Sequence, residues 1–385
     1  MIEVLTCNNI AEVGLNILPG GQFSIAKSAD APDAILVRSA ALHDLNLNDN
    51  LLCIARAGAG VNNIPIDKCT QKGIVVFNTP GANANAVREL VLCALVLSSR
   101  DIVSGINWAK KLTGDDVPAQ VEKGKNAFVG PEILGKTLGV VGLGAIGVRV
   151  ANAAHHLGME VYGVDPYISV NSAWGLSRNV RRAPDYESLY AVSDYITLHV
   201  PVNKETTGMI NADTISRMKD GVRIINLARG DLVDNKAIIA ALNSGKVSSY
   251  VTDFPTEELL NVPNVIPIPH LGASTPESED NCAAMACSQL RDYMLYGNIQ
   301  NSVNLPDVSL PPAGVRLCVI HQNIPSMLSM ISSTLSSAGI NIEHLVSKSK
   351  NDIAYALLDV SAVPDDTLVQ NLLRTEGIMR VRVIA

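Results

Sequence analysis

The chain has 385 residues, of which 47% are hydrophobic and 17% are charged, and its formal net charge is −7. A chain of this length is too long to fold around one small hydrophobic core, so we expect two or three domains. The acidic balance, with no block of like charges, argues against nucleic-acid binding as the main role, and an anionic substrate would need a local basic pocket.

The first 95 residues predict a lobe in which strands and helices alternate. Short apolar runs, each bounded by Gly, Pro or Asn, recur at the spacing of an α/β fold. They lie at residues 1–5, 34–37, 52–55 and 74–77. The apolar stretch 89–104 then predicts a long buried helix, and residues 114–130, rich in Gly, Lys and Asp, predict an exposed connection.

A glycine-rich turn follows the apolar strand predicted at residues 138–141. Gly142, Gly144 and Gly147 form a G-x-G-x-x-G pattern, and an Ala/Val pattern typical of a helix comes next. Such a loop lets backbone amides approach a pyrophosphate at a helix N-terminus, where the helix dipole favours negative charge. The expected cofactor-binding residues of this turn are Gly142, Gly144, Ala145, Ile146 and Gly147.

The next predicted strand, residues 160–164, ends at Asp165. A carboxylate at this position can accept hydrogen bonds from the adenosine ribose hydroxyls, and it would repel a 2′-phosphate. Strand, glycines, helix, strand and acid thus occur in the order that dinucleotide binding requires. We therefore predict NAD, rather than NADP, as the cofactor.

Three further predicted strands of this lobe end at polar residues that could reach a ligand. Ligands of doubly wound sheets lie beyond the carboxyl ends of the strands, and His199, Arg229 and Asp253 fall at such ends. The three strands are predicted at residues 193–201, 221–229 and 248–253. His199 could equally be a histidine that is packed at a strand end.

Hydride transfer from an alcohol needs a base for the hydroxyl proton and a cation for a carboxylate or developing carbonyl. Arg229, Glu258 and His270 could supply this set, because imidazole titrates near neutral pH and a carboxylate on its other nitrogen would hold its tautomer. Taken singly, they could be a turn arginine, a solvated glutamate and a capping histidine. Their order behind one nucleotide fold favours the catalytic interpretation.

The C-terminal part follows a different pattern. A helix predicted at residues 278–296 leads to a Pro-rich stretch at residues 304–312, which we expect to be a linker. The last 70 residues predict the order βαββαβ, which is that of a ferredoxin-like domain. Its strands are predicted at residues 315–320, 341–347, 354–360 and 379–384, and its helices at residues 325–338 and 367–374.

Three motifs together resemble those of the D-2-hydroxyacid dehydrogenase family. They are Val-Gly-Leu-Gly-Ala-Ile-Gly at residues 141–147, Asn-Leu-Ala-Arg-Gly at 226–230 and Pro-His-Leu-Gly-Ala-Ser-Thr at 269–275. The resemblance covers nearly the whole chain. It implies NAD-dependent oxidation of a small phosphorylated 2-hydroxy acid, D-3-phosphoglycerate, to 3-phosphohydroxypyruvate, the first step of L-serine biosynthesis.

The resemblance also implies the domain organisation. Two Rossmann-like α/β lobes, a substrate lobe and an NAD-binding lobe, would precede a C-terminal ferredoxin-like βαββαβ ACT domain. The implied substrate-binding domain comprises residues 1–95 and 280–305, the NAD-binding domain residues 96–279, and the ACT domain residues 313–385.

In the resembled family, Arg229 would bind substrate, His270 would be the base, and a glutamate between them would pair with this histidine. The chain has Thr-Asp-Phe-Pro-Thr-Glu-Glu-Leu at residues 252–259, where the family usually has Asp-Val-Phe-x-x-Glu-Pro. Matching the Asp selects Glu258, and matching the Phe selects Glu257. The ungapped spacing from Arg229 favours Glu258, although the short segment before His270 suggests that the loop differs.

The first lobe resembles the family's substrate lobe at residues 56–63, Arg-Ala-Gly-Ala-Gly-Val-Asn-Asn. Backbone amides of residues 58–60 would hold a carboxylate as an anion nest does, although a simple tight turn has the same composition. Arginines suit a phosphate because guanidinium contacts can be bidentate, but Arg38 could also be a surface residue at a strand end. The implied substrate-binding residues are Arg38, Ser39, Arg56, Gly58, Ala59, Gly60 and Asn83. The implied cofactor-binding residues beyond the glycine turn are Asp165, His199, Val200, Pro201, Thr206, Ala228 and Asp253.

Residues 320–326, Ile-His-Gln-Asn-Ile-Pro-Ser, resemble the amino-acid-binding ACT domain of these dehydrogenases. His321, Asn323 and Asn341 match positions that bind L-serine, which implies feedback regulation at an interface of a homo-oligomer, a dimer or a tetramer. The family often has glycine where this chain has Ser326, and the added Cβ could reshape the pocket. The alternative is a dimerisation module whose site is empty or different.

Two other functions compete with this interpretation. One is another D-2-hydroxyacid dehydrogenase, such as a glyoxylate or hydroxypyruvate reductase, against which Arg38 and the C-terminal domain argue. The other is a non-catalytic NAD(H)-sensing binding protein, against which the set of Arg229, Glu258 and His270 argues. No pair of His, Cys or Asp residues has metal-ligand spacing, so we expect no metal.

The cysteines and the apolar runs bear on location. Seven cysteines without C-x-x-C spacing, several of them inside apolar runs, indicate reduced thiols in a reducing compartment. The first residues show no basic region followed by an apolar core. The longest apolar run, residues 90–97, is far shorter than the ~20 residues that span a bilayer. We expect a cytoplasmic protein with no membrane partner.

Overall fold

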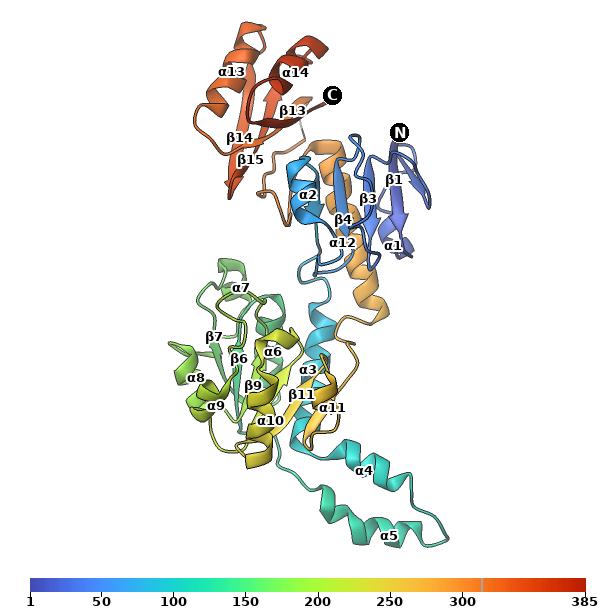
Figure 1. Cartoon of the computed structure of the whole chain (residues 1–385), viewed down its shortest axis with the longest axis vertical. Coiled ribbons are helices and arrows are strands. Elements are labelled where there is room, and N and C mark those ends of the chain that lie inside the picture. Colours follow the sequence, from blue (N-terminus) through green and yellow to red (C-terminus); the bar gives the residue numbers. More distant parts are fainter. Residues whose placement is uncertain (313) are drawn as a thin grey trace. The chain divides into compact units, whose positions relative to one another are not determined.

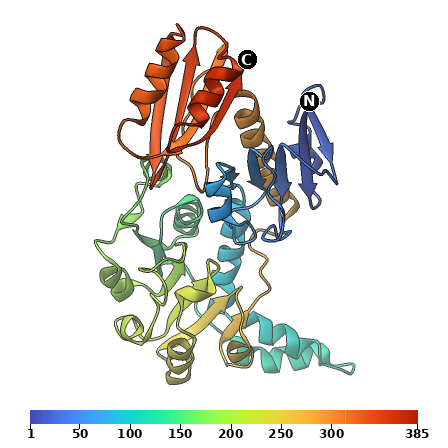
Figure 2. The same ribbon diagram turned by 45° about the horizontal axis from the view of Figure 1, so that its top comes forward.

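The computed structural model describes residues 1–312 and 314–385. They form two compact units, one containing Met1–Asn83 and Pro276–Ala385 and the other Ala84–Thr275. Each unit contains a parallel sheet flanked by helices (Figures 1 and 2), which confirms the predicted α/β class with Rossmann-like lobes.

The first unit starts with a parallel sheet in the order β2-β1-β3-β4-β5. Its strands are β1 (Ile2–Cys7), β2 (Phe23–Ala26), β3 (Ala34–Val37), β4 (Cys53–Arg56) and β5 (Val75–Phe77). Alternate side chains of these strands feed two separate apolar cores, so β3 and β5 are buried at every position. The edge strand β2 was not predicted, because Ser24 interrupts a short segment whose middle is exposed.

Helices α1 (Glu12–Leu15), α2 (Ile66–Gln71) and α12 (Pro276–Tyr296) belong to the same unit. The long helix α12 packs on β4 and α1. Its buried side chains, with one face of the parallel sheet, form a core that continues into the C-terminal sheet through Tyr355 and Leu357.

The C-terminal part of this unit is an antiparallel sheet in the order β14-β15-β13-β16. Figure 2 shows its two helices side by side on one face of the sheet. The elements are β13 (Val315–Gln322), α13 (Met327–Ser337), β14 (Ile342–Lys350), β15 (Ile353–Val360), α14 (Asp366–Leu373) and β16 (Ile378–Ile384).

The Pro-rich stretch at residues 304–312, which we expected to be a linker, contains no helix or strand, but part of it packs against the first unit. Leu305 and Val308 are each 1% exposed and join the core around α12. Val308 also exchanges backbone hydrogen bonds with Ile299. The prolines end regular structure here, but the apolar residues between them still bury their side chains.

The second unit is a larger parallel sheet in the order β12-β11-β10-β9-β6-β7-β8. Its strands are β6 (Thr137–Val141), β7 (Glu160–Val164), β8 (Arg181–Arg182), β9 (Tyr195–Leu198), β10 (Val222–Asn226), β11 (Val247–Thr252) and β12 (Val265–Pro267). The chain runs outward from β6 in one direction and then restarts at β9 in the other, so the strand order reverses there. Ligands of doubly wound sheets bind at such a reversal.

Helices cover both faces of this sheet (Figure 1). They are α3 (Ala84–Ser99), α6 (Ala145–His156), α7 (Val170–Gly175), α8 (Tyr186–Val192), α9 (Ala212–Ser216), α10 (Asn235–Ser244) and α11 (Glu257–Leu260), with a 3-10 turn at Gly230–Leu232. Among the helices of the described residues, none combines the length and apolar character needed to cross a bilayer.

Two predicted boundaries in this region were wrong. The helix predicted at residues 89–104 is two helices, α3 and α4 (Ile102–Ala109), and Asp101 caps the second by accepting a hydrogen bond from the Ser104 amide. The connection predicted at residues 114–130 contains α5 (Val117–Gly124) and a 3-10 turn, Lys125–Phe128. The ring of Phe128 packs against Trp108, a long-range contact that local composition does not reveal.

Candidate active site

The glycine turn of the second unit is shaped for close approach to its backbone. Gly142 has a φ of 89°, and a Cβ built on it would lie 2.6 Å from the carbonyl oxygen of His199. A Cβ on Gly147 would overlap the carbonyl oxygen of Gly142, whereas one on Gly144 would meet open space. Helix α6 starts at Ala145, directly after this turn. The turn therefore fits the pyrophosphate of a dinucleotide at a helix N-terminus.

Asp165 follows β7 and ties the glycine turn to the end of that strand. Its Oδ2 accepts a hydrogen bond from the amide of Leu143, and its Oδ1 accepts one from the amide of Tyr167, each at 2.8 Å. Each carboxylate oxygen keeps a further lone pair for a ribose hydroxyl. Asp165 thus lies beside the glycine turn at the end of β7, and its contact with the adenosine ribose stays a prediction.

The loop after β9 carries four of the predicted cofactor residues. The Oγ1 of Thr206 donates to the carbonyl of Pro201 at 2.6 Å and accepts from the amide of Asn203 at 2.9 Å, so the loop is internally braced. Val200 lies beside Gly142, because a Cβ on that glycine would come 2.8 Å from Val200 Cγ1. Asn203 was not predicted; its side chain also accepts from two loop amides.

His199 also belongs to this loop, and its amide donates to the carbonyl of Val141 at 2.7 Å. Burial lowers the pKa of the imidazole to about 3, so the ring is neutral at physiological pH. Its Nε2 lies 3.0 Å from Thr197 Oγ1. A neutral, partnered ring is compatible with the packed strand-end alternative, and the contact of His199 with the cofactor stays a prediction.

Arg229 follows β10 and is presented by a buried asparagine. The Oδ1 of Asn226 accepts from the amides of Ala228 and Arg229, and its Nδ2 donates to the carbonyl of Arg229 at 2.8 Å. The Arg229 side chain is exposed, and its Nη1 donates to the carbonyl of Ala228 at 2.6 Å. The sequence did not predict this scaffolding role of Asn226, and the available signal was its place in the motif at residues 226–230.

His270 follows β12, and its ring is held between two residues that follow β11. Its Nδ1 lies 3.8 Å from Oδ2 of Asp253, and its ring meets that of Phe254 edge to face at a centroid distance of 4.6 Å. The His270 side chain is 59% exposed, whereas that of Asp253 is 1% exposed. The structure therefore brings together two residues that the sequence had placed in different roles.

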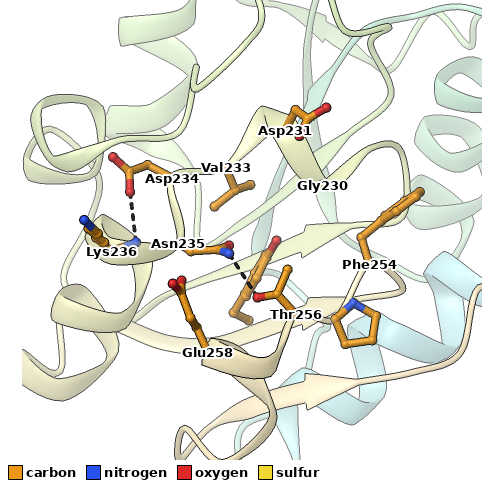
Figure 3. Close-up of a pocket in the computed structure, with 11 residues that line it drawn as sticks. Gly230, Asp231, Val233, Asp234, Asn235, Lys236, Phe254, Thr256 and Glu258 are labelled. Carbon is orange, nitrogen blue, oxygen red and sulfur yellow. Dashed lines mark hydrogen bonds between the residues drawn. The ribbon is translucent and has the colours of Figure 1, made fainter.

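Glu258, predicted to pair with His270, lies elsewhere in the second unit. It is exposed on the short helix α11, and it lines a cavity of about 500 Å³. Figure 3 shows its carboxylate at the end of the cavity near Asn235 and Lys236, with Phe254 at the opposite end. Within residues 1–312 and 314–385, Asp253 is the carboxylate at ion-pair distance from His270.

In the first unit, Arg38 follows β3 at the carboxyl edge of the sheet. The Oδ1 of Asn8 accepts from the amides of Arg38, Ser39 and Ala40 at 2.9–3.1 Å, so one side chain from the end of β1 shapes this loop. The Arg38 guanidinium is partly exposed and pairs with Glu279 at 2.6 Å. Asn8 was not predicted, because its partners lie 30 residues away.

The loop after β4 holds the predicted carboxylate site of the first unit. Arg56 donates from its Nε to the carbonyl of Arg38 at 3.0 Å, and a Cβ on Gly58 would overlap its guanidinium. The amide of Gly58 already donates to the carbonyl of Arg56. Of the three amides predicted to hold a carboxylate, that of Gly58 is thus engaged within the turn. Ala59 and Asn83 also lie in partly exposed loops after β4 and β5.

The three predicted serine-binding residues lie near strand ends of the C-terminal sheet. Asn323 directly follows β13, and Asn341 directly precedes β14. His321 is buried at the end of β13; its Nδ1 contacts the carbonyl of Gln322 at 2.7 Å, and its Nε2 has no partner among the described residues. Asn323 and Asn341 are exposed. Ser326, where the resembled family often has glycine, has a left-handed φ of 71°, a conformation that glycine adopts with less strain.

In the part of the chain that the structure describes, no group of three or more His, Cys, Asp or Glu side chains is arranged to hold a metal ion. The seven cysteines are free thiols.

Comparison with known proteins relates both units to one group of enzymes. The model of the D-isomer specific 2-hydroxyacid dehydrogenase NAD binding domain matches residues 97–272. D-3-phosphoglycerate dehydrogenase 1 of Saccharomyces cerevisiae is 30% identical over 402 residues, which cover 94% of this chain and 82% of the yeast protein. D-3-phosphoglycerate dehydrogenase of Bacillus subtilis is 36% identical over 324 residues, and the match spans 80% of this chain but only 59% of that protein.

A solved structure is similar as well. The crystal structure of NAD+-bound 3-phosphoglycerate dehydrogenase from Entamoeba histolytica is 27% identical, with a TM-score of 0.60. The similarity covers 79% of this chain and 98% of that one.

Proposed function

Because this chain belongs to the D-isomer specific 2-hydroxyacid dehydrogenase family, we propose that it oxidises D-3-phosphoglycerate to 3-phosphohydroxypyruvate, the first step of L-serine biosynthesis. NAD is the cofactor, and the second unit carries the matching NAD-binding domain. The glycine turn and Asp165 fit the pyrophosphate and the adenosine ribose, and the carboxylate disfavours a 2′-phosphate.

One observation carries the catalytic assignment. Arg229 and His270 are exposed and follow β10 and β12, which flank β11 in the nucleotide-binding sheet. Parallel strands present their carboxyl ends at one edge, so both side chains lie at the edge where such sheets bind ligands. A guanidinium and an imidazole at that edge are the two groups that oxidation of a 2-hydroxy acid requires from the protein.

The proposed chemistry assigns one task to each side chain. The imidazole of His270 takes the proton of the substrate hydroxyl as the carbonyl forms. Bound NAD supplies the acceptor for the hydride. Arg229 donates hydrogen bonds to the substrate carboxylate or the developing keto oxygen, which orients the reacting carbon and stabilises negative charge on oxygen. The glutamate partner that we predicted, Glu258, stays a prediction.

The phosphate assignment rests on the first unit and on the relatives. Arg38 and Arg56 are linked, since Arg56 donates to the carbonyl of Arg38, and two guanidinium groups suit a doubly charged phosphate. The exposed pair of Arg38 with Glu279 would exchange for the phosphate at little cost, because such surface pairs contribute at most about 1 kcal/mol. The yeast and Bacillus relatives are both named for D-3-phosphoglycerate.

The test is NADH formation from NAD and D-3-phosphoglycerate at alkaline pH, with D-glycerate and D-lactate in parallel. We expect a strong preference for the phosphorylated acid. The variant Arg38→Gln should raise the KM for D-3-phosphoglycerate and leave that for D-glycerate unchanged, because only the former carries the phosphate.

Equal or better turnover of the unphosphorylated acids would refute the substrate and leave another dehydrogenase of the family, such as a glyoxylate or hydroxypyruvate reductase. NADH binding without turnover of any of the three acids would refute the enzyme and favour an NAD(H)-sensing binding protein.

We further propose that residues 313–385, of which 314–385 are described, are an ACT domain of ferredoxin-like fold that binds L-serine. The support is the antiparallel sheet with two helices on one face and the buried His321, whose Nε2 has no partner among the described residues. Residues 1–95 with 280–305 would then be the substrate-binding domain and residues 96–279 the NAD-binding domain. A symmetric dimer or tetramer would let one effector act on several subunits.

The serine proposal is tested by the initial rate of NADH formation during titration with L-serine, with D-serine as the matched control. We expect inhibition by the L-isomer alone. If neither isomer changes the rate or the unfolding midpoint, the C-terminal domain does not sense serine.

A further inference from the structure

Two loops of the first unit lie side by side at the carboxyl edge of its parallel sheet. They follow the neighbouring strands β4 and β5, in which Ala55 lies opposite Phe77. The loop after β4 contains residues 58–60, which the sequence predicted as a carboxylate site. The loop after β5 starts at Asn78, for which the sequence predicted no role. Parallel strands present their carboxyl ends at one edge, so the second loop can support the first.

Asn78 and Thr79 hold two successive carbonyl groups of the first loop. The Nδ2 of Asn78 donates to the carbonyl of Ala59 at 2.7 Å, and the amide of Thr79 donates to the carbonyl of Gly58 at 3.1 Å. Asn78 is half-buried and Thr79 is fully buried, so these bonds lie partly out of reach of water and are strengthened by the lower dielectric. Both carbonyls therefore face the loop after β5.

The direction of these carbonyls fixes the direction of two amides. The carbonyl of Gly58 and the amide of Ala59 belong to one peptide group, and the carbonyl of Ala59 and the amide of Gly60 belong to the next. Both groups are trans and planar, so each N–H points opposite to its C=O. The two amides thus point away from the loop after β5, and neither donates a hydrogen bond within the described part of the chain.

Two successive amides that point the same way suit an anion, and a carboxylate offers one oxygen to each. A guanidinium adds positive charge at the same loop, because a Cβ built on Gly58 would overlap Nη1 of Arg56. The Nε of Arg56 donates to the carbonyl of Arg38 at 3.0 Å, which holds this side chain in place. In a chain with a net charge of −7, such a local arrangement is what attracts an anionic substrate.

Helix α12 anchors the backbone of Asn78. The Nε2 of Gln289 donates to the carbonyl of Asn78 at 3.0 Å, and Gln289 is only 7% exposed. The backbone from which the Asn78 side chain extends is therefore fixed by a buried residue of the same unit. A supporting side chain that is itself held in this way can keep a binding loop in one geometry.

We propose that Asn78 is a positioning residue for the substrate carboxylate: it turns the carbonyl of Ala59 away from the site, so that the amides of Ala59 and Gly60 both face the carboxylate. This rests on the proposed dehydrogenase function. Asn78 does not touch the substrate but acts through the peptide group that it holds. A loop that is already oriented loses little conformational freedom when the substrate binds, which lowers the KM.

The test compares Asn78→Ala with Asn48→Ala in the full-length chain, using steady-state oxidation of D-3-phosphoglycerate and D-glycerate. Asn48 is the matched control because its Oδ1 also holds one backbone group, the amide of Leu51 at 2.9 Å, but it precedes β4 and so lies at the opposite edge of the sheet. Asn78→Ala should raise the KM about two- to tenfold, the effect of one hydrogen bond, with kcat unchanged. Asn48→Ala should change neither constant.

The two substrates identify which group of the acid is affected. Both carry the carboxylate, so Asn78→Ala should raise both KM values by the same factor, whereas Arg38→Gln should act on the phosphorylated acid alone. Asn78→Asp keeps the size of the side chain but cannot donate when it is ionised, so its KM values should be at least as high as those of Asn78→Ala. Unchanged KM values in Asn78→Ala, or a rise for D-3-phosphoglycerate only, would overturn the proposal.

A second measurement does not depend on turnover and separates this proposal from the proposed function. D-glycerate and glycerol differ only in that a carboxylate replaces a CH2OH group, and a ligand that binds the folded protein raises its unfolding midpoint. At equal ionic strength, D-glycerate should stabilise wild type and Asn48→Ala more than glycerol does. This excess should shrink in Asn78→Ala even if no acid is oxidised. An equal excess in wild type and Asn78→Ala would refute the positioning role.

Discussion

Two aspartates of this chain are almost fully buried, and each lies beside an exposed histidine. In the nucleotide-binding unit, Asp253 lies 3.8 Å from His270, whose side chain is 59% exposed. In the C-terminal sheet, Asp359 lies 3.5 Å from His344, whose side chain is 70% exposed. The two neighbouring histidines are thus alike in their distance from the aspartate and in their exposure.

The two aspartates differ in whether they have a second partner besides the histidine. Asp359 accepts a hydrogen bond at 2.7 Å from Arg316, whose side chain is 2% exposed and also donates to the carbonyl of Tyr296 at the end of α12. Among the described residues, neither carboxylate oxygen of Asp253 has a hydrogen-bond partner. A buried carboxylate that is satisfied within the protein stabilises structure, whereas one left with free lone pairs is available for chemistry.

The largest expected effect is on kcat, when each of these two histidines is replaced by alanine. His270→Ala should lower kcat for oxidation by about 10²–10⁴-fold, which is the usual contribution of a general base, and should leave NADH binding intact. His344→Ala should leave kcat unchanged, because the carboxylate beside it remains paired with Arg316.

Steady-state kinetics and a fluorescence titration of NADH on both variants make this measurement. Full activity in His270→Ala would contradict the catalytic assignment. A comparable loss in His344→Ala would show that the two pairs are not functionally distinct.

The next effect concerns stability. Arg316→Ala would strand a buried carboxylate and free the Tyr296 carbonyl, so it should cost about 3–5 kcal/mol in the free energy of unfolding. The control is Arg181→Ala, since Arg181 pairs with Glu160 on the surface and its removal should cost far less stability. Urea unfolding of both variants measures the difference, and equal small losses would contradict the structural role of the Arg316–Asp359 pair.

The smallest effect is the stability of Asp253→Asn and its dependence on pH. Burial raises the pKa of Asp253 in the folded state above its unfolded value. The folded state therefore binds this proton more tightly, and ionisation of Asp253 destabilises the native protein as the pH rises through that window. We expect Asp253→Asn to be more stable than wild type by about 1 kcal/mol at pH 7, with the gain disappearing below about pH 4.

Thermal unfolding of the two proteins across this pH range tests the sign. A loss of stability in Asp253→Asn at pH 7 would mean that the carboxylate, like Asp359, is satisfied in the folded protein.

Much of the nucleotide-binding site could be predicted because its signals are local. The spacing of Gly142, Gly144 and Gly147 between two apolar strands indicates the turn, and Asp165 closes the next strand. The residues that support the site were missed for the opposite reason. Asn8 shapes the Arg38 loop although it lies 30 residues earlier in the sequence, and no local sequence pattern predicts that contact.

The pairing of His270 illustrates the same limit. Sequence matching left Glu257 and Glu258 as alternatives and assigned Asp253 to the cofactor. The structure places Asp253 at the ring, because the register of β11 and β12 decides which side chains leave the sheet together. A shift of one residue in that register would turn different side chains toward the site.

The sequence by itself determined the α/β class, the glycine turn, the preference for NAD and the strand ends that carry polar residues. The class, the turn and the strand ends follow from apolar periodicity and from backbone preferences that act over a few residues. The preference for NAD follows from the carboxylate of Asp165, which would repel a 2′-phosphate. Only the tertiary structure decided which carboxylate lies beside His270, which one is neutralised by Arg316, and that Leu305 and Val308 join the core around α12. Those outcomes depend on distances between segments far apart in the chain, and burial there sets the free energy of each charge.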